Sequence, residues 1–249
     1  MSYRKLFRAA ASLAACFSAA FAFNLPFREY PGQEYSNFPL PPDYQEKTEF
    51  VFARLMYPDG FGRFFGFRRS MDWHQGYTNW TNDYPRADRH LAVAIRRLTR
   101  IHVRSVEQPV SLDDGEEYLD RGGFLICDDI WGDSEWESFL ETMVRVLPNR
   151  PVVDLENEDP AFHTVYDLDH RYQISGQWSL RSGIPYLNGG VVPHWRGIYD
   201  ERKRLKVAVW VNNDTGDSWE WADAPEYPER YSALGIRVVL NHIVYAMTH

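Results

Sequence analysis

The stretch that most constrains the fold is Gly122–Asp129, which reads Gly-Gly-Phe-Leu-Ile-Cys-Asp-Asp. Two glycines followed by four apolar residues, with helix-like segments on either side, predict a short buried strand. The carboxylates of Asp128 and Asp129 stand where that strand should end. With 249 residues the chain is long enough to build one large domain around such a strand.

Strand-like and helix-like segments alternate along the rest of the chain. Short apolar runs predict strands at Phe50–Met56, Ile101–Val106, Pro109–Leu112, Val152–Val153 and Leu205–Val211. Apolar residues three and four apart predict helices over Ala87–Leu98, Ser134–Val146 and Glu229–Met247. This alternation predicts an α/β fold of three layers, with a mostly parallel central sheet and helices on both faces.

Local signals mark where two of these helices begin. Ser134 and Glu137 form a capping box, and Pro148 ends the helix that follows. Asn82 or Asp83 is the expected cap of the earlier helix, with Pro85 in its first turn.

Two of the predicted strands end in polar residues. Asp128 and Asp129 follow one, and Asn212, Asn213 and Asp214 follow the other, with Asp217 close behind. Ligands of parallel α/β sheets bind outside the carboxyl ends of the strands. If the two strands are neighbours, we expect a ligand-binding crevice there, contributed by Asp128, Asp129, Asn213, Asp214 and Asp217.

The N-terminus has the pattern of an export signal. Basic residues precede an uncharged apolar run, and Ala20-Phe21-Ala22 fits a cleavage site, which predicts a signal peptide over residues 1–22 and a periplasmic or secreted protein. The alternative is a lipoprotein box, Leu13-Ala14-Ala15-Cys16, with a lipid on Cys16. Cleavage at Ala22 would change the net charge from −8 to −11, because three basic residues and no acidic one are removed.

This balance of charge limits the partners. An acidic protein has no electrostatic reason to bind nucleic acid or anionic lipid, and no later segment is apolar enough to span a membrane. Five prolines between residues 23 and 47 predict an extended leader or linker, followed by a single domain over residues 48–249. We assign no structure to Tyr172–His194.

The chemistry of the strand ends is open between three interpretations. One of Asp128 and Asp129 can cap a helix while the other is solvated, which needs no ligand. The pair can bind a ligand, with Asp128 and Asp214 as candidate catalytic groups. With Asp214 or Asp217 it can also hold Mg²⁺ or Ca²⁺, as in a divalent-metal-dependent hydrolase, although no metal-binding motif is present. No other cofactor is indicated.

The remaining nucleophiles and bases do not form a known catalytic signature. Cys127 lies in an apolar run before two carboxylates, which raise the pKa of a thiol, so we expect a buried, inert side chain. His163 is a candidate general base that can share a helical turn with Tyr166, although a surface role is the simpler interpretation. The chain has no zinc motif and no Gly-x-Ser-x-Gly elbow, and we leave open whether it is an enzyme.

The aromatic segment from Trp73 to Tyr84 has two interpretations. Its rings, among Asn and Asp side chains, can stack on a sugar or a peptide, which would make Trp80, Asp83 and Tyr84 walls of the crevice, together with Tyr166. Alternatively, the rings only cover the core.

Several short motifs, in this order, resemble a bacterial family of unknown function, number four-one-five-nine of the domain catalogue. They are Trp80 with Asp83-Tyr84-Pro85, Gly122-Gly123-Phe124-Leu125 with Asp128-Asp129, Pro160 with Phe162 and Tyr166, Gly197-Ile198-Tyr199, and Asn213-Asp214 with Gly216-Asp217 and Trp219-Glu220. The resemblance covers Thr48–His249. It implies a flavodoxin-like fold of the class I glutamine amidotransferase superfamily, and no established activity. Cys127 lacks the flanking glycines of an amidotransferase nucleophile, so glutaminase chemistry is not implied.

We therefore expect an exported α/β domain that binds a ligand, such as a glycan or a peptide, at the carboxyl ends of its strands. The main alternative is a non-catalytic module of the cell envelope that uses the fold to bind a protein partner.

Overall fold

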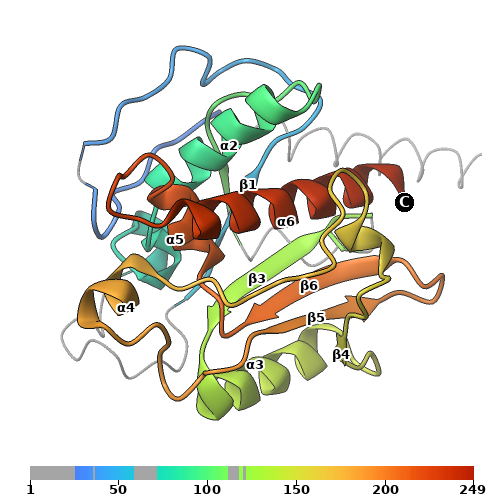
Figure 1. The fold of residues 1–249 in the computed structure, drawn as a ribbon. Coiled ribbons are helices and arrows are strands. Elements are labelled where there is room, and N and C mark those ends of the chain that lie inside the picture. The colour runs from blue at the N-terminus through green and yellow to red at the C-terminus, as the bar shows by residue number, and fades with distance from the viewer. Residues whose placement is uncertain (1–25, 36, 59–71, 112–117, 120–121) are drawn as a thin grey trace, which may run out of the picture.

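The computed structural model describes residues 26–35, 37–58, 72–111, 118–119 and 122–249 (Figure 1). It confirms the α/β class. A parallel pair consists of β1 (Ala53–Met56) and β2 (Gln108–Ser111). A four-stranded sheet has the order β3 (Leu125–Ile130), β6 (Leu205–Val211), β5 (His194–Tyr199) and β4 (Val153–Asp154).

Helices cover both faces of the four-stranded sheet (Figure 1). The longest, α6 (Glu229–Thr248), packs on the face that carries Ala208 and Trp210. On the opposite face, α3 (Gly132–Val146) packs against Val207, Val209 and Val211. The other helices are α2 (Arg86–Leu98), α4 (Gln177–Ser182) and α5 (Thr215–Glu220), with 3₁₀ turns η1 (Trp73–Gln75), η2 (Asn79–Thr81) and η4 (Pro160–Phe162).

Strand β6 is the centre of the sheet because its sequence is apolar on both faces. All seven of its residues are buried. Such a run is typical of an inner strand with a helix on each side, and it agrees with the sequence prediction.

The prediction of a mostly parallel sheet is wrong for the four-stranded sheet. Strand β6 is parallel to β3, but β5 is antiparallel to both β6 and β4. Residues 200–204 alone connect β5 to β6, in a tight turn in which Asp200 accepts from the backbone of Arg204. A crossover to a parallel neighbour needs a dozen or more residues, so this connection forces a hairpin. Helix α4 lies in the segment Tyr172–His194, to which the sequence assigned no structure, and β5 begins at the last residue of that segment.

The predicted helix starts were wrong by a few residues. The cap of α3 is Trp131, whose backbone N–H donates to Glu135 Oε2 at 2.8 Å, so Ser134 and Glu137 form no capping box. Helix α2 is capped by Pro85, after a cis peptide bond, and not by the side chain of Asn82 or Asp83. Helix α2 follows a turn at residues 82–85, and α3 follows Trp131, whose backbone is extended.

The described part of the leader contacts the domain through Asp43. Arg96 pairs with Asp43, and the backbone of Ser105 donates to the same carboxylate at 2.9 Å. The predicted signal peptide lies outside the described residues. Within the part of the chain that the structure describes, no helix is long and apolar enough to cross a membrane.

Candidate functional site

The ends of β3 and β6 lie side by side, as the sequence predicts. The backbone N–H of Asp129 donates to the carbonyl oxygen of Asn213 at 3.0 Å. Asp128 Oδ2 accepts from the backbone N–H groups of Thr215 and Gly216, at 2.9 and 3.0 Å, and from the Thr215 hydroxyl. The Asp128 carboxylate therefore fixes the start of α5 against the end of β3.

Asp129 occupies a break in the strand. Its φ of 58° lies in the left-handed region, and the pairing with β6 shifts register between Cys127 and Ile130. The Trp131 indole N–H donates to Asp129 Oδ1 at 2.6 Å. The residue is accessible to solvent, yet it is crowded by protein, and burial together with Asp128 raises its pKa well above the usual value.

The residues after β6 have structural roles of their own. Asn213 is fully buried, and its amide group bonds the backbone of Val211 and Ile174. Asp214 is the N-cap of α5, where its Oδ1 accepts from the Asp217 N–H at 2.9 Å.

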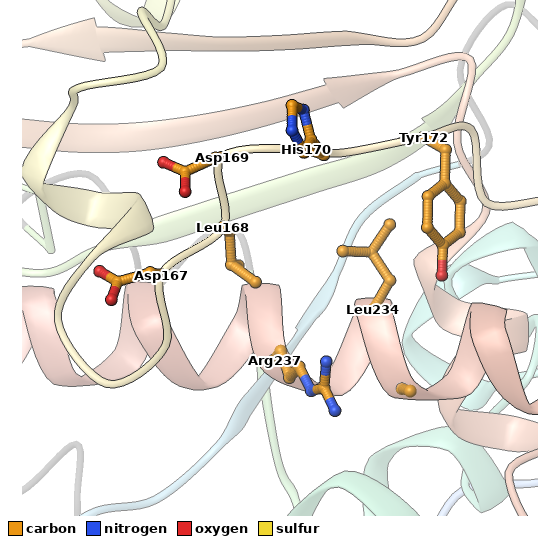
Figure 2. Close-up of a pocket in the computed structure, with 8 residues that line it drawn as sticks. Asp167, Leu168, Asp169, His170, Tyr172, Leu234 and Arg237 are labelled. Carbon is orange, nitrogen blue, oxygen red and sulfur yellow. The ribbon is translucent and has the colours of Figure 1, made fainter.

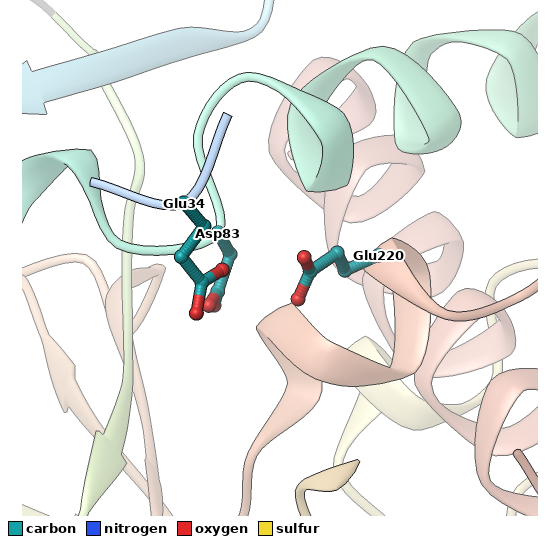
Figure 3. A group of neighbouring side chains, drawn as sticks. All are labelled: Glu34, Asp83 and Glu220. Atoms are coloured by element: carbon teal, nitrogen blue, oxygen red, sulfur yellow. The ribbon is translucent and has the colours of Figure 1, made fainter. Parts of the chain in front are cut away.

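Five carboxylates gather beyond these strand ends, and we call them the carboxylate cluster: Glu34, Asp83, Asp214, Asp217 and Glu220. They form two groups of three that share Asp83. Within each group, one oxygen of every residue lies within 4.8 Å of the others. Figure 3 shows one group, in which Glu220 points from α5 toward Glu34 and Asp83.

The cluster is assembled from three parts of the chain. Asp214, Asp217 and Glu220 are three residues apart, a spacing that places side chains on one face of a helix. Asp83 comes from the turn before α2, where its φ is 58°. Glu34 comes from the docked leader.

Two glycines make the close approach of these carboxylates possible. A methyl group at Gly176 would overlap Asp214 Oδ2 and would lie 2.9 Å from Asp217 Oδ2. At Gly216 it would lie 2.6 Å from Asp83 Oδ2. The next backbone N–H, that of Gln177, donates to Asp217 Oδ2 at 2.5 Å. The backbone therefore lies directly against the cluster, with no side chain between.

The cluster gathers negative charge, and the nearest arginines, Arg54 and Arg86, only partly offset it. Among the described residues, none of its five carboxylates forms an ion pair with a lysine or an arginine. Burial and then the charge of Asp217 raise the pKa of Asp83 and of Asp214 well above the usual value. Burial also raises the pKa of Glu220 to about 8. Like charges this close favour protonation, or a bound cation.

Other predicted site residues lie elsewhere. Trp80 and Tyr84 are buried in a small core with Met56, so they are not walls of a crevice, and the interpretation of this aromatic segment as a cover for the core is the better one. His163 is partly exposed and its imidazole bonds Asp167 and the carbonyl oxygen of Asn157. The structure does not bring it to the cluster.

Tyr166 also lies away from the cluster, because its backbone is bonded at both N–H and C=O to the side chain of Asn241 in α6. Cys127 is partly buried and makes no disulfide. Burial and the charge of Asp128 raise its pKa to about 12, which agrees with the expected inert thiol.

A cavity of about 220 Å³ lies at a different place, between α6 and the segment before α4 (Figure 2). Leu168 and Leu234 are its buried residues, and Asp169, His170, Tyr172 and Arg237 stand around them. None of the residues that the sequence predicts as ligand-binding lines it. The sequence therefore locates the carboxylates but not this hollow.

Sequence reasoning missed Glu34 and Glu220 as members of the cluster. Glu220 had a usable signal, because Asp214, Asp217 and Glu220 repeat every three residues at the start of a helix. Asp83 was predicted to line the wall of the crevice, and in the structure it is the carboxylate that both groups share. Glu34 had no signal, since it lies in a proline-rich segment without periodicity.

The fold and this cluster define an α/β domain with an acidic edge. The chain belongs to the family described as domain of unknown function (DUF4159), whose model matches residues 115–247, more than half of the chain. The matched segment includes β3, α5 and three of the five clustered carboxylates, and it leaves out Glu34 and Asp83. A search of curated proteins finds no match.

Proposed function

We propose that this protein binds a divalent cation in the carboxylate cluster and that the cation-loaded edge is where its ligand binds. The observation that carries the proposal is the arrangement of five carboxylates in two groups that share Asp83. Carboxylate oxygens are the ligands that Mg²⁺ and Ca²⁺ prefer. A cation would also offset the repulsion among these neighbouring carboxylates.

The ligand that we expect is a glycan or a peptide, as the sequence analysis predicts. Both carry hydroxyl or carbonyl oxygens, which can complete the coordination of a hard cation. We also propose that the protein is exported, on the strength of its basic and then apolar N-terminus. The proposed relation to glutamine-amidotransferase-like, flavodoxin-like domains rests on the order of the sequence motifs and on the position of the cluster at the carboxyl ends of β3 and β6.

Hydrolysis is the catalytic form of this proposal. The two groups of three carboxylates share Asp83, so each group could hold one cation. Two such cations would stabilise the attacking and the leaving oxygen of a hydrolysis reaction. Activity would then depend on the added cation.

A non-catalytic envelope module is the second candidate, and a separate observation favours it. In α4 and in the segment between α4 and β5 several large apolar residues are exposed, and Trp178 in α4 is the most exposed of them at 76%. Apolar surface of this kind is typical of a docking site for another protein.

The test of the first proposal is a titration of the EDTA-treated protein with MnCl₂, CaCl₂ and MgCl₂, followed by calorimetry and by thermal unfolding. We expect at least one cation to bind with a dissociation constant below about 1 mM and to raise the midpoint of unfolding. Asp217→Asn should weaken that binding at least tenfold, because it removes a ligand from the cluster.

The matched control is Asp223→Asn. Asp223 is an exposed carboxylate outside the cluster, in an ion pair with Arg86, so this variant should bind the cation like the parent. Absence of binding for all three cations, or equal binding by Asp217→Asn and the parent, would contradict the proposal.

A further inference from the structure

The cavity between α6 and the segment before α4 is lined by two stretches of chain (Figure 2). On α6, Ala233, Leu234 and Arg237 are three and four residues apart, so they share one face of the helix. The other stretch is Asp167–Tyr172, which is neither helix nor strand. Within it Leu168 is buried, and the other side chains that line the cavity are exposed.

Hydrogen bonds fix this second stretch against the domain. The Tyr172 hydroxyl donates to the carbonyl oxygen of Arg230 at 2.6 Å, which ties the aromatic wall of the cavity to α6. Arg171 donates from Nη1 to the carbonyl oxygen of Leu168 at 2.6 Å and from Nη2 to Asn157 Oδ1 at 2.9 Å. The wall is therefore in place before any ligand binds, and a preformed site loses little conformational entropy on binding.

The cavity carries one acidic and one basic side chain that are available to a ligand. Asp169 and Arg237 both line it, and both are exposed. Among the described residues neither forms a hydrogen bond or an ion pair, and the Arg237 guanidinium faces the ring of Tyr166 at 5.7 Å. Asp167 also lines the cavity, but it pairs with His163. The cavity thus offers a carboxylate to a cationic group and a guanidinium to an anionic group.

Apolar surface lies between these two charges. Figure 2 shows Leu168 between Asp169 and Arg237, and Leu234 is the second buried residue of the cavity. The Tyr172 ring, 44% exposed, stands beside them. The volume of about 220 Å³ is below the ~300 Å³ at which pockets for drug-sized ligands begin. It therefore suits a molecule of the size of an amino acid.

We infer that this cavity binds a small zwitterion, namely an amino acid or a dipeptide with an apolar side chain. Arg237 donates to the carboxylate of the ligand, and Asp169 accepts from its ammonium group. The apolar side chain of the ligand packs on Leu168 and Leu234, beside Tyr172. A neutral sugar would leave the guanidinium without an anion, and a ligand that is only anionic would leave the carboxylate without a cation.

This site is separate from the proposed cation site, because no residue of the carboxylate cluster lines the cavity. The inference therefore does not depend on cation binding, and it adds a second ligand to the protein.

The experiment compares related ligands by calorimetry and by ligand-observed NMR. L-Leucine carries both charges, L-leucinamide only the positive one, and N-acetyl-L-leucine only the negative one. L-Phenylalanine and L-leucyl-L-leucine extend the series to a ring and to a second residue. We expect leucine to bind with a dissociation constant below about 1 mM. Each single-charge derivative should bind at least about tenfold more weakly, because it leaves one charged side chain of the cavity without a partner.

Two variants test the two charges separately. Arg237→Gln should weaken leucine binding at least about tenfold and abolish the preference for leucine over leucinamide. Asp169→Asn should abolish the preference for leucine over N-acetyl-leucine. Both side chains are exposed, so neither substitution should disturb folding. Ala233→Met, which fills the cavity from α6 with a good helix former, should weaken leucine binding with both charges still present.

Arg97→Gln and Glu158→Gln are the matched controls, because both residues are exposed and neither lines the cavity. They should bind leucine like the parent. The inference is wrong if leucine, phenylalanine and leucyl-leucine all fail to bind the parent, or if Arg237→Gln binds leucine as tightly as the parent. Equal binding of leucine and either single-charge derivative would also overturn it, since one charge on the ligand would then be enough. None of these outcomes depends on whether a divalent cation binds the carboxylate cluster.

Discussion

Two groups of charged side chains meet at the start of α2, and they are organised in opposite ways. On one side, Arg54 forms two contacts with Asp88, at 2.8 and 3.0 Å, and Arg89 lies 3.5 Å from Glu107. On the other side, the carboxylate cluster has no ion pair to lysine or arginine within the described chain. The carboxylates of the first group face arginines, and those of the second form no ion pair within the described residues.

This difference separates structural charge from functional charge. A buried ion pair is stable only when both partners are present and well oriented, and the Arg54–Asp88 pair meets this condition. A protein that gathers carboxylates without a cationic partner keeps a site that a proton or a metal ion can neutralise. Under our proposal the cluster binds a cation and the ion pairs contribute stability, and three experiments test this difference.

The largest effect should come from breaking the balanced group. Asp88→Ala leaves the Arg54 guanidinium without its partner, and loss of one member of a buried pair costs about 3–5 kcal/mol. Urea unfolding at neutral pH measures this free energy. Asp223→Ala, which removes the exposed partner of Arg86, should cost less than about 1 kcal/mol. A cost below 1 kcal/mol for Asp88→Ala would mean that the two groups do not differ.

A smaller effect should follow from crowding the unbalanced group. Gly176→Ala adds a methyl group that overlaps Asp214 Oδ2, and at a φ of −67° the backbone tolerates alanine without strain. We expect the affinity for the cation to fall about tenfold, or about 1.4 kcal/mol. Calorimetry with MnCl₂ gives the value.

The control for this variant is the neighbouring Ser175→Ala. Ser175 is buried, and its hydroxyl has no hydrogen-bond partner among the described residues, so the substitution should leave cation affinity unchanged. If Gly176→Ala and Ser175→Ala bind the cation with equal affinity, the absence of a side chain at Gly176 is not needed for cation binding.

The smallest effect is a dependence of stability on pH. The pKa of Glu220 is raised from 4.5 to about 8, so the folded state holds this proton more tightly than the unfolded state. Its contribution to the free energy of unfolding is complete below pH 4.5 and is lost as the pH rises toward 8. From about pH 7 to pH 9, in EDTA, we expect stability to fall by about 1 kcal/mol from this group alone.

Two further measurements test whether Glu220 causes this dependence of stability on pH. Glu220→Gln should flatten it, and a saturating divalent cation should reverse it, because the cation replaces the proton. Burial lowers the pKa of His242 to about 4, which destabilises the protein only as the pH falls below about 6.5. A stability that rises from pH 7 to pH 9 without a cation would contradict the cluster as an unbalanced group.

The sequence predicted most of the secondary structure that depends on local pattern. The alternation and burial of Leu205–Val211, the helical spacing of Glu229–Met247 and the apolar run before Asp128 all correspond to observed elements. The meeting of Asp128–Asp129 with Asn213–Asp214 was expected on condition that their two strands are neighbours. Strand β3 does pair with β6, although β3 is an edge strand of the sheet.

The direction of β5 and the true helix caps could not be derived in the same way. A hairpin or a crossover depends on where the next strand pairs, and residues 172–194 contain too many glycines, prolines and serines to show a period. The cap of α3 is likewise decided by a neighbouring turn, where Asn188 approaches Gly132.

The carboxylate cluster is the clearest case of what folding adds. Local spacing places Asp214, Asp217 and Glu220 on one helix face, and a helical period is visible in a sequence. Glu34 and Asp83 join them only because the leader crosses back over the turn before α2, held there by Arg89 from within the helix. Contacts between residues far apart in the chain leave no periodic trace, since they are selected by the packing of the whole domain. The pattern along the chain therefore determines the elements and the edge at which they end, and tertiary structure alone decides which charges meet there.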